Sequence, residues 1–259
     1  MSCDVVLLAG PFRSSTIVYN FLKSRFDLRH VIIESLPSRA EILRNRLRKL
    51  GVAAVLGQLC FRSLVVPYLR FASRSRMQQI DSEFHLDLAA IPDRDITNVD
   101  SVNSPQCVAL LRELQPRSIV VHGTRILSPE VLNVALGKFI NLHAGITPTY
   151  RGVHGAYWAL SERQPQLCGV TVHVVDEGID TGAILGQATI SPSAEDNFAT
   201  YERLQVAAGL PLLEEALRAR LNGNGGAVRA PVFAGGVSKL WTHPTLAQYL
   251  RNRWRQGVK

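Results

Sequence analysis

The stretch Asp4-Val-Val-Leu-Leu-Ala-Gly10 is an uninterrupted apolar run that ends in glycine and is followed at once by Pro11. A short apolar run closed by Gly-Pro is typical of a strand that is buried on both faces. After three small hydroxyl-bearing residues, 14–16, apolar side chains recur at helical spacing over residues 17–22, which predicts a helix. A second apolar run, His30-Val-Ile-Ile-Glu34, completes a strand–helix–strand unit, so we expect a parallel sheet.

The same alternation of helical and strand patterns returns in the middle of the chain. Helical spacing covers residues 108–114 and 129–136, and short apolar strands are expected at 118–121 and 139–143. A longer helical pattern follows at 200–221. This order predicts an α/β fold of the Rossmann-like, doubly wound kind with a mostly parallel sheet.

A basic segment at about residues 36–80 interrupts this alternation. It contains two apolar stretches, 52–61 and 64–69, and we expect one or two amphipathic basic helices packed on the sheet. Neither stretch reaches the roughly 18 to 20 residues that span a bilayer, and Arg62 and Arg70 interrupt them. A helix lying on a membrane surface stays open as the alternative.

The domain organisation follows from these patterns. We expect one catalytic domain over residues 1–221, including the basic helical insertion, and a short C-terminal extension over residues 222–259. The extension opens with the glycine-rich turn 222–226 and ends in a basic, helix-like tail at 245–255. The sequence leaves open whether this tail forms a homodimer contact.

Composition restricts the function without choosing it. The 259 residues include 29 Lys or Arg and 21 Asp or Glu, and a net charge of +8 suits nucleic acid, an anionic membrane or a phosphorylated substrate. The four cysteines, Cys3, Cys60, Cys107 and Cys168, form no C-x-x-C pair and have no histidines at zinc-ligand spacing, so we expect buried reduced thiols and no metal. No signal peptide is recognised at the N-terminus, which favours the cytoplasm.

The densest group of polar side chains with catalytic potential lies at the end of the strand 139–143. Asn141 and His143 share one side of this strand, because side chains alternate along a strand. The alternating strand 169–175 ends in a tight acidic loop that carries Asp180, and we expect Asp180 to reach His143 if the two strands are neighbours.

An amide, an imidazole and a carboxylate suit acyl transfer to an amine. The asparagine donates to the developing oxyanion, a cationic histidine stabilises charge or shuttles a proton, and the carboxylate orients the histidine and holds it protonated. No serine or cysteine nucleophile is needed, because an amine attacks directly.

These motifs resemble the folate-dependent formyltransferases, the family of glycinamide ribonucleotide, methionyl-tRNA and sugar N-formyltransferases. The family's Asn-x-His, Pro and Tyr-Arg-Gly-like pattern is similar to Asn141-Leu-His143, Pro148 and Tyr150-Arg-Gly152. Its second signature, a strand with an inner histidine that ends in Asp-x-Gly, is similar to residues 169–182, and its folate-facing Arg-Ile-Leu to residues 125–127.

The resemblance implies 10-formyltetrahydrofolate as the formyl donor and Asn141, His143 and Asp180 as catalytic residues. It also implies a folate-binding set, which consists of Arg125, Ile126, Leu127, Val175, Asp176 and Glu177. On the acceptor side we expect Arg13, Ser14, Tyr150, Arg151 and His154. His173, inside its strand, is a candidate supporting group.

Departures from the family narrow the acceptor. Residues 10–15, Gly-Pro-Phe-Arg-Ser-Ser, replace the glycine-rich phosphate loop of the purine enzyme, although Arg13 and two serines can still hold a phosphate at a helix N-terminus. The stretch after Leu221 is too short for the C-terminal barrel of the methionyl-tRNA enzymes, so a tRNA acceptor is disfavoured despite the positive charge. A small-molecule amine, such as a nucleotide-linked amino sugar, is favoured.

Three alternatives stay open for the chain as a whole. A hydrolase of 10-formyltetrahydrofolate uses a similar constellation with water as the acceptor. A non-catalytic scaffold that binds a membrane or nucleic acid through residues 36–80 is the second. Peripheral membrane contact of an active enzyme through the same residues is the third.

Overall fold

The computed structural model describes residues 4–223 and 237–259, and its centre is a seven-stranded sheet in the order β3-β2-β1-β4-β5-β7-β8. The first five strands of this order run parallel, β7 is antiparallel to β5, and β8 is antiparallel to β7 and so runs in the same direction as the first five. The strands are β1 (Val5–Ala9), β2 (Leu28–Glu34), β3 (Ile96–Val99), β4 (Ser118–His122), β5 (Phe139–His143), β7 (Gly169–Val174) and β8 (Ile184–Thr189).

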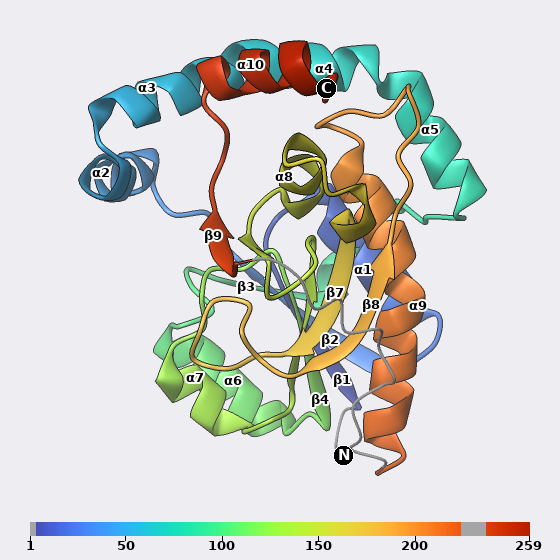
Figure 1. Cartoon of the computed structure of the whole chain (residues 1–259). Helices are drawn as coiled ribbons and strands as arrows, with labels where there is room; N and C mark the ends of the chain where they lie inside the picture. The colour runs from blue at the N-terminus through green and yellow to red at the C-terminus, as the bar shows by residue number, and fades with distance from the viewer. Residues whose placement is uncertain (1–3, 224–236) are drawn as a thin grey trace.

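Helices cover both faces of this sheet (Figure 1). Along β1, Leu7 faces a core that includes residues of α1 (Arg13–Lys23) and α9 (Tyr201–Leu221), and Leu8 faces a second core with residues of α6 (Pro105–Leu114) and α7 (Pro129–Val134). Because neighbouring strand residues point to opposite faces, an all-apolar strand needs both layers. The doubly wound, mostly parallel α/β fold predicted from the sequence is confirmed.

The basic insertion contains more helix than the sequence predicted. It consists of α2 (Arg39–Leu50), α3 (Val52–Cys60), a π-helical turn (Phe61–Val65), α4 (Val66–Ala72) and α5 (Arg74–Glu83).

The middle three segments form one helix from Val52 to Ala72, 21 residues long, with a mean hydropathy of 1.6 over an 18-residue window, which is long and apolar enough to cross a membrane by length and composition. The expectation that no stretch here reaches that length was wrong. Arginine is a good helix former, so Arg62 and Arg70 did not end the helix.

The insertion is packed on the fold along one side. The ring of Phe61 is fully buried and contacts the rings of Phe198 and Tyr249 at centroid distances of 4.9 and 5.0 Å. Arg76 makes two hydrogen bonds to Asp196, at 2.9 and 3.0 Å. In Figure 1, α3, α4 and α10 (Leu246–Gln256) lie together as a layer above α8 (Gly155–Ser161). We call this layer of α3, the π-helical turn, α4 and α10 the roof.

The described part of the C-terminal extension returns to the middle of the chain. Its strand β9 (Lys239–Trp241) pairs in parallel with β6 (Tyr150–Gly152) to form a separate two-stranded sheet. The ring of Trp241 stacks between Trp158, at 4.6 Å, and Tyr150, at 5.8 Å. The predicted glycine-rich turn lies only partly inside the described residues, since residues 224–226 fall outside them.

The thiols follow the sequence prediction in part. Cys107 and Cys168 are buried and free, and burial raises the pKa of these thiols to about 11 and about 12. Cys60 is free but exposed, because it lies on the outer side of α3. Cys3 lies outside the described residues.

Phe61 tests whether the insertion is a fixed part of the fold. Replacing Phe61 with alanine removes a fully buried ring, and we expect it to lower the free energy of unfolding by about 3 to 5 kcal/mol. Urea unfolding followed by circular dichroism measures this. Leu64→Ala, at a site 65 % exposed on the same helix, is the control and should change stability by less than about 0.5 kcal/mol. Equal effects of the two changes would show that the helix is not docked.

Candidate active site

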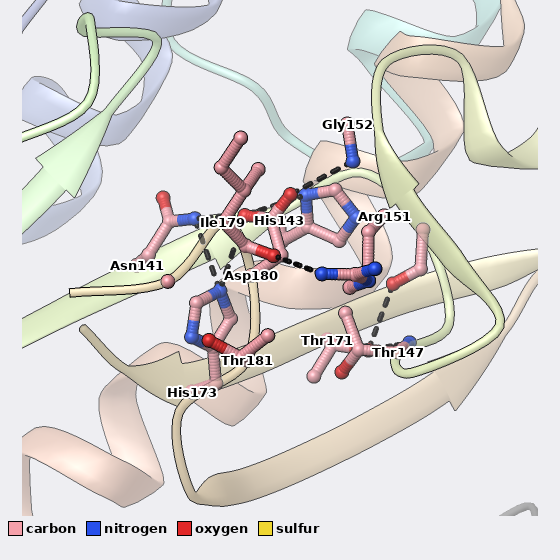
Figure 2. A network of polar contacts seen from close by, with 12 residues as sticks. Asn141, His143, Thr147, Arg151, Gly152, Thr171, His173, Ile179, Asp180 and Thr181 are labelled. Atoms are coloured by element: carbon pink, nitrogen blue, oxygen red, sulfur yellow. Dashed lines mark hydrogen bonds and ion pairs between the residues drawn. The ribbon is translucent and has the colours of Figure 1, made fainter. Parts of the chain in front are cut away.

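Antiparallel pairing of β5 with β7 assembles the site. In this register Asn141 lies opposite His173, and His143 lies opposite Thr171. The chain leaves β7, turns, and returns so that Asp180 lies beside both histidines (Figure 2). The two strands are therefore neighbours, which is the condition under which the sequence predicted that Asp180 reaches His143, and the three predicted catalytic residues lie together.

The carboxylate of Asp180 contacts four groups. Its Oδ2 accepts a hydrogen bond from the backbone N–H of Gly152 at 2.8 Å. Its Oδ1 lies 3.4 Å from both His143 Nδ1 and Asn141 Nδ2, and 3.6 Å from His173 Nε2. Burial raises the pKa of Asp180, but the Gly152 N–H and the two histidines around it outweigh burial and hold the pKa below its ordinary value. Asp180 is therefore ionised at neutral pH.

His143 is held at both ring nitrogens. Its Nε2 donates to the backbone oxygen of Tyr150 at 2.8 Å, which leaves Nδ1 facing Asp180. The side chain is 6 % exposed, and this burial lowers the pKa of His143 more than Asp180 and the Tyr150 carbonyl raise it. The imidazole is therefore neutral at pH 7, in contrast to the protonated form expected from the sequence.

Asn141 is positioned by His173. The Nδ1 of His173 donates to the backbone oxygen of Val174 at 2.8 Å, so its Nε2 is free to accept the Asn141 amide at 3.1 Å. Figure 2 shows the amide nitrogen of Asn141 turned toward His173 and Asp180, with its oxygen turned away. His173 thus lies where the sequence placed a supporting group, and the oxyanion donor of the sequence analysis is engaged by two partners.

A buried network holds the loop between β5 and β6. The hydroxyl of Thr171 donates to the backbone oxygen of Gly145 at 2.8 Å and accepts from the backbone N–H of Thr147 at 3.1 Å. Gln187 donates to the backbone oxygen of Thr147 at 2.8 Å. This loop carries the Tyr150 carbonyl and the Gly152 amide, so the network fixes two of the partners of the site.

The loop that carries Asp180 is fixed from both ends. Asp176 accepts hydrogen bonds from the backbone N–H of Gly178 at 3.1 Å and the hydroxyl of Thr181 at 2.7 Å, which closes the turn. Arg151 donates to the backbone oxygen of Ile179 at 3.2 Å. Arg151, which the sequence assigned to the acceptor, thus contacts the loop of Asp180.

The predicted folate-binding residues occupy two loops that meet at one apolar cluster. Leu127 is buried in this cluster, Val175 packs against it, and Ile126, Asp176 and Glu177 are exposed. The Arg125 side chain is not free, since its guanidinium lies 2.8 Å from the carboxylate of Glu34. A flat aromatic ligand would meet the backbone and apolar atoms of these loops.

The residues predicted to bind the acceptor differ in where the structure places them. Arg13 and Ser14 begin α1 just beyond the carboxyl end of β1, the sheet edge at which His143 also lies. The assignment of the Tyr150 side chain to substrate binding was wrong, because its ring is fully buried and its hydroxyl donates to Glu162 at 3.0 Å. Only its backbone oxygen takes part in the site.

His154 joins a group that the sequence did not predict. Its Nε2 and the Nδ1 of His243 are 2.8 Å apart in a hydrogen bond. Burial, together with the positive charges of Arg62 and Arg46, lowers the pKa of His154 to about 3. We call these four residues the cationic cluster. Its residues lie far apart in the sequence, so no sequence motif could have indicated the cluster.

His122 is another buried histidine that the sequence analysis did not single out as a site residue. It ends β4, which is paired with β5, and it is 7 % exposed. Its Nδ1 is buried without a hydrogen-bond partner among the described residues. Its position at the carboxyl end of a central strand is the signal that could have marked it.

Residues 74–215, a little more than half of the chain, match the family model described as formyl transferase. The chain belongs to the formyl transferase family. All three predicted catalytic residues lie within the matched segment. Among residues 4–223 and 237–259, no three His, Cys, Asp or Glu side chains are grouped to hold a metal ion.

Curated relatives of the family match part of the chain. A methionyl-tRNA formyltransferase of Thermodesulfovibrio yellowstonii is 40 % identical over 108 residues, which are 41 % of this chain and 35 % of that protein. The matched segment thus spans about a third of the length of such relatives.

Solved structures match nearly the whole chain. A sugar N-formyltransferase from Shewanella has a TM-score of 0.53 at 18 % identity and covers 96 % of this chain and 87 % of that one. A likely sugar N-formyltransferase from Mycobacterium tuberculosis has a TM-score of 0.55 at 13 % identity, covering 98 % and 87 %. At these identities the likeness shows the fold alone.

The charge state of His143 is directly measurable. We expect its imidazole resonances in NMR to titrate with a pKa below the ordinary value near 6.5, because burial opposes the proton. In Asp180→Asn the pKa should fall further, since Asp180 raises it. The His143→Gln spectrum assigns the signal. A pKa above 7 in the wild type would contradict the neutral resting state.

Proposed function

We propose that this chain transfers a formyl group from 10-formyltetrahydrofolate to a primary amine of a small molecule. The observation that carries the proposal is the convergence of Asn141, His143 and Asp180 inside the segment that matches the formyl transferase family. We propose the cytoplasm as its location, in line with the free thiols of Cys60, Cys107 and Cys168.

The geometry suits proton removal from an attacking amine. The amine nitrogen bonds to the formyl carbon, the carbonyl becomes an oxyanion, and the bond from that carbon to the folate nitrogen then breaks as this nitrogen gains a proton. A neutral His143 with Nε2–H bound to a carbonyl has its basic lone pair on Nδ1. The Oδ1 atom of the ionised Asp180 lies 3.4 Å from this Nδ1. Asp180 would therefore stabilise the imidazolium cation that forms when Nδ1 accepts the proton.

Asn141 is proposed to stabilise the oxyanion or to orient the amine. Its amide nitrogen donates to His173 at 3.1 Å, and its amide oxygen points away from this pair. The free oxygen suits a hydrogen bond from the amine, and a small rotation frees an N–H for the oxyanion. Either role needs the amide fixed in place, which His173 provides.

The acceptor is proposed to carry negative charge, as a nucleotide-linked amino sugar does. The cationic cluster supports this, because His154 and His243 lie within the positive potential of Arg46 and Arg62. The two guanidinium charges would attract an anionic acceptor. Sugar N-formyltransferases are among the proteins whose structures share this fold.

Donor binding is the first test. Calorimetric titration with 5-formyltetrahydrofolate, a stable analogue, should show saturable binding, and Asp180→Asn should weaken it by removing the charge that fixes the loop after β7. Asp93→Asn, an exposed acid on a 3-10 turn, is the matched control and should bind like the wild type. Absence of binding up to millimolar analogue would reject the folate donor.

Loss of the proposed base or its partner should affect the reaction rather than the fold. We expect His143→Gln and Asp180→Asn each to reduce kcat/KM for formyl transfer by about a hundredfold or more, the scale of a lost acid–base or electrostatic group. Circular dichroism checks the fold of each variant. Wild-type rates in either variant would remove that residue from the mechanism.

The cationic cluster makes a prediction about the acceptor alone. With a nucleotide-linked amino sugar as acceptor, Arg46→Gln with Arg62→Gln should raise KM at least about tenfold and leave kcat within about twofold, because the lost charges act on binding. Arg112→Gln, an exposed arginine on α6, is the control. Formylation of methionyl-tRNA in preference to every small amine would contradict the proposed acceptor, and release of formate without any amine would identify a hydrolase.

A further inference from the structure

The helix from Val52 to Ala72 has two different faces. One face packs on the fold through buried residues that include Val55, Phe61 and Leu69. The opposite face carries six large apolar side chains that are each at least 42 % exposed, namely Val52, Leu56, Leu59, Leu64, Tyr68 and Phe71. We call this set the outer stripe. At about 1.5 Å per residue the helix presents it over about 30 Å.

The π-helical turn keeps the outer stripe continuous. The stripe residues recur at steps of four and three from Val52 to Leu59 and again from Leu64 to Phe71, but the step between these halves is five. The longer step falls on the π-helical turn Phe61–Val65, which takes up one extra residue. Both halves therefore face the same way. A stripe kept in line by a helical irregularity is a single surface.

Helix α10 adds two exposed apolar side chains to the roof. It lies beside α3 and α4 in the roof (Figure 1), and its Leu250 and Trp254 are 53 % and 83 % exposed. The two other tryptophans, Trp158 and Trp241, are buried. A surface with exposed leucines and an exposed tryptophan and tyrosine resembles the interfacial face of a membrane-bound protein, where aromatic rings lie at headgroup level.

The positive charge of the chain is concentrated here. Residues 42–80 contain eight Lys or Arg and no Asp or Glu, and the rest of the chain contains 21 of each sign, so this segment alone accounts for the net charge of +8. Helix α10 adds three arginines and no acid. Six of the cations in residues 42–80 are exposed and form no ion pair within the described residues; they are Arg44, Arg48, Lys49, Arg62, Arg70 and Arg74.

The positive charge around the outer stripe favours some binding partners over others. Two copies of the chain joined by their outer stripes would bring two sets of unpaired cations together, which disfavours a homodimer. Nucleic acid would match the charge but not the apolar stripe. An anionic lipid surface matches both, because headgroups attract the arginines and acyl chains accept the apolar side chains.

We propose that the outer stripe, with the exposed residues of α10, is a docking surface for an anionic lipid bilayer. The helix lies in the plane of the interface, because its other face is fixed to the fold by Phe61 and Leu69 along its length. The site around Asp180 stays in the domain beneath the roof, in the aqueous phase. The inference does not depend on the acceptor proposed above.

Vesicle binding tests this surface without any enzymatic reaction. With vesicles of equal parts phosphatidylcholine and phosphatidylglycerol at low salt, the full chain should co-sediment, and the exposed Trp254 should shift its fluorescence to shorter wavelength. Pure phosphatidylcholine vesicles should bind the chain far more weakly, and added salt should release it. Trp254→Phe should remove the spectral shift and retain most of the binding.

Matched variants separate the two contributions. Leu64→Gln with Tyr68→Gln removes part of the stripe and should weaken binding at least about tenfold. Arg70→Gln with Arg74→Gln should weaken it about fivefold per charge at low salt. Leu136→Gln and Arg112→Gln make the same chemical changes at exposed positions on the α6–α7 side, remote from the roof, and should bind like the wild type.

Three outcomes would overturn the proposal. The first is no binding of the wild type to anionic vesicles at low salt. The second is equal binding by the stripe variant and the wild type. The third is a concentration-dependent dimer, seen by analytical ultracentrifugation, that the stripe variant abolishes. Folate binding in the same samples reports on the proposed function separately.

Discussion

The structure around the site depends on one buried negative charge. Removing a carboxylate from water is costly unless polar groups replace the water, and Asp180 finds these in the N–H of Gly152 and the imidazole rings of His143 and His173. Each partner comes from a different segment, so satisfying one charge requires β5, β7, the loop after β7 and β6 to meet at one point. The arrangement proposed for catalysis is therefore also the arrangement that makes the charge tolerable.

Burial sets the chemistry of the histidines in the same region. His143 lies beside a carboxylate and a carbonyl, both of which favour the proton, yet burial is the larger effect on its pKa. Burial also lowers the pKa of His154, to about 3, and the positive charges of Arg62 and Arg46 add to this effect. His143 is thereby suited to accept a proton that a neighbouring carboxylate stabilises, whereas His154 is neutral, so the positive charge of the cationic cluster belongs to Arg46 and Arg62.

The sequence predicted the elements whose signal is local. The apolar strands β1 and β5 and the spacing of Asn141, His143 and Asp180 were all legible, because each depends on neighbouring residues. The single helix from Val52 to Ala72 was not predicted, because Arg62 and Arg70 interrupt its apolar stretches. The π-helical turn within it has no residue spacing by which a sequence could indicate it. Nor were β3 and β8 predicted, because β3 is short and partly polar. The His154–His243 contact joins residues 89 positions apart, which no local pattern can reveal.

The pairing of β6 with β9 has a consequence for synthesis of the chain. Asn141, His143 and Asp180 are all translated before residue 183, but β6, which supplies the Tyr150 carbonyl and the Gly152 amide, acquires its partner strand only with Lys239–Trp241. At about 5 to 20 residues per second, the ribosome needs several more seconds to reach that strand. A nascent chain, or one cut short by a premature stop codon, then holds every proposed catalytic side chain without the strand that fixes their backbone partners.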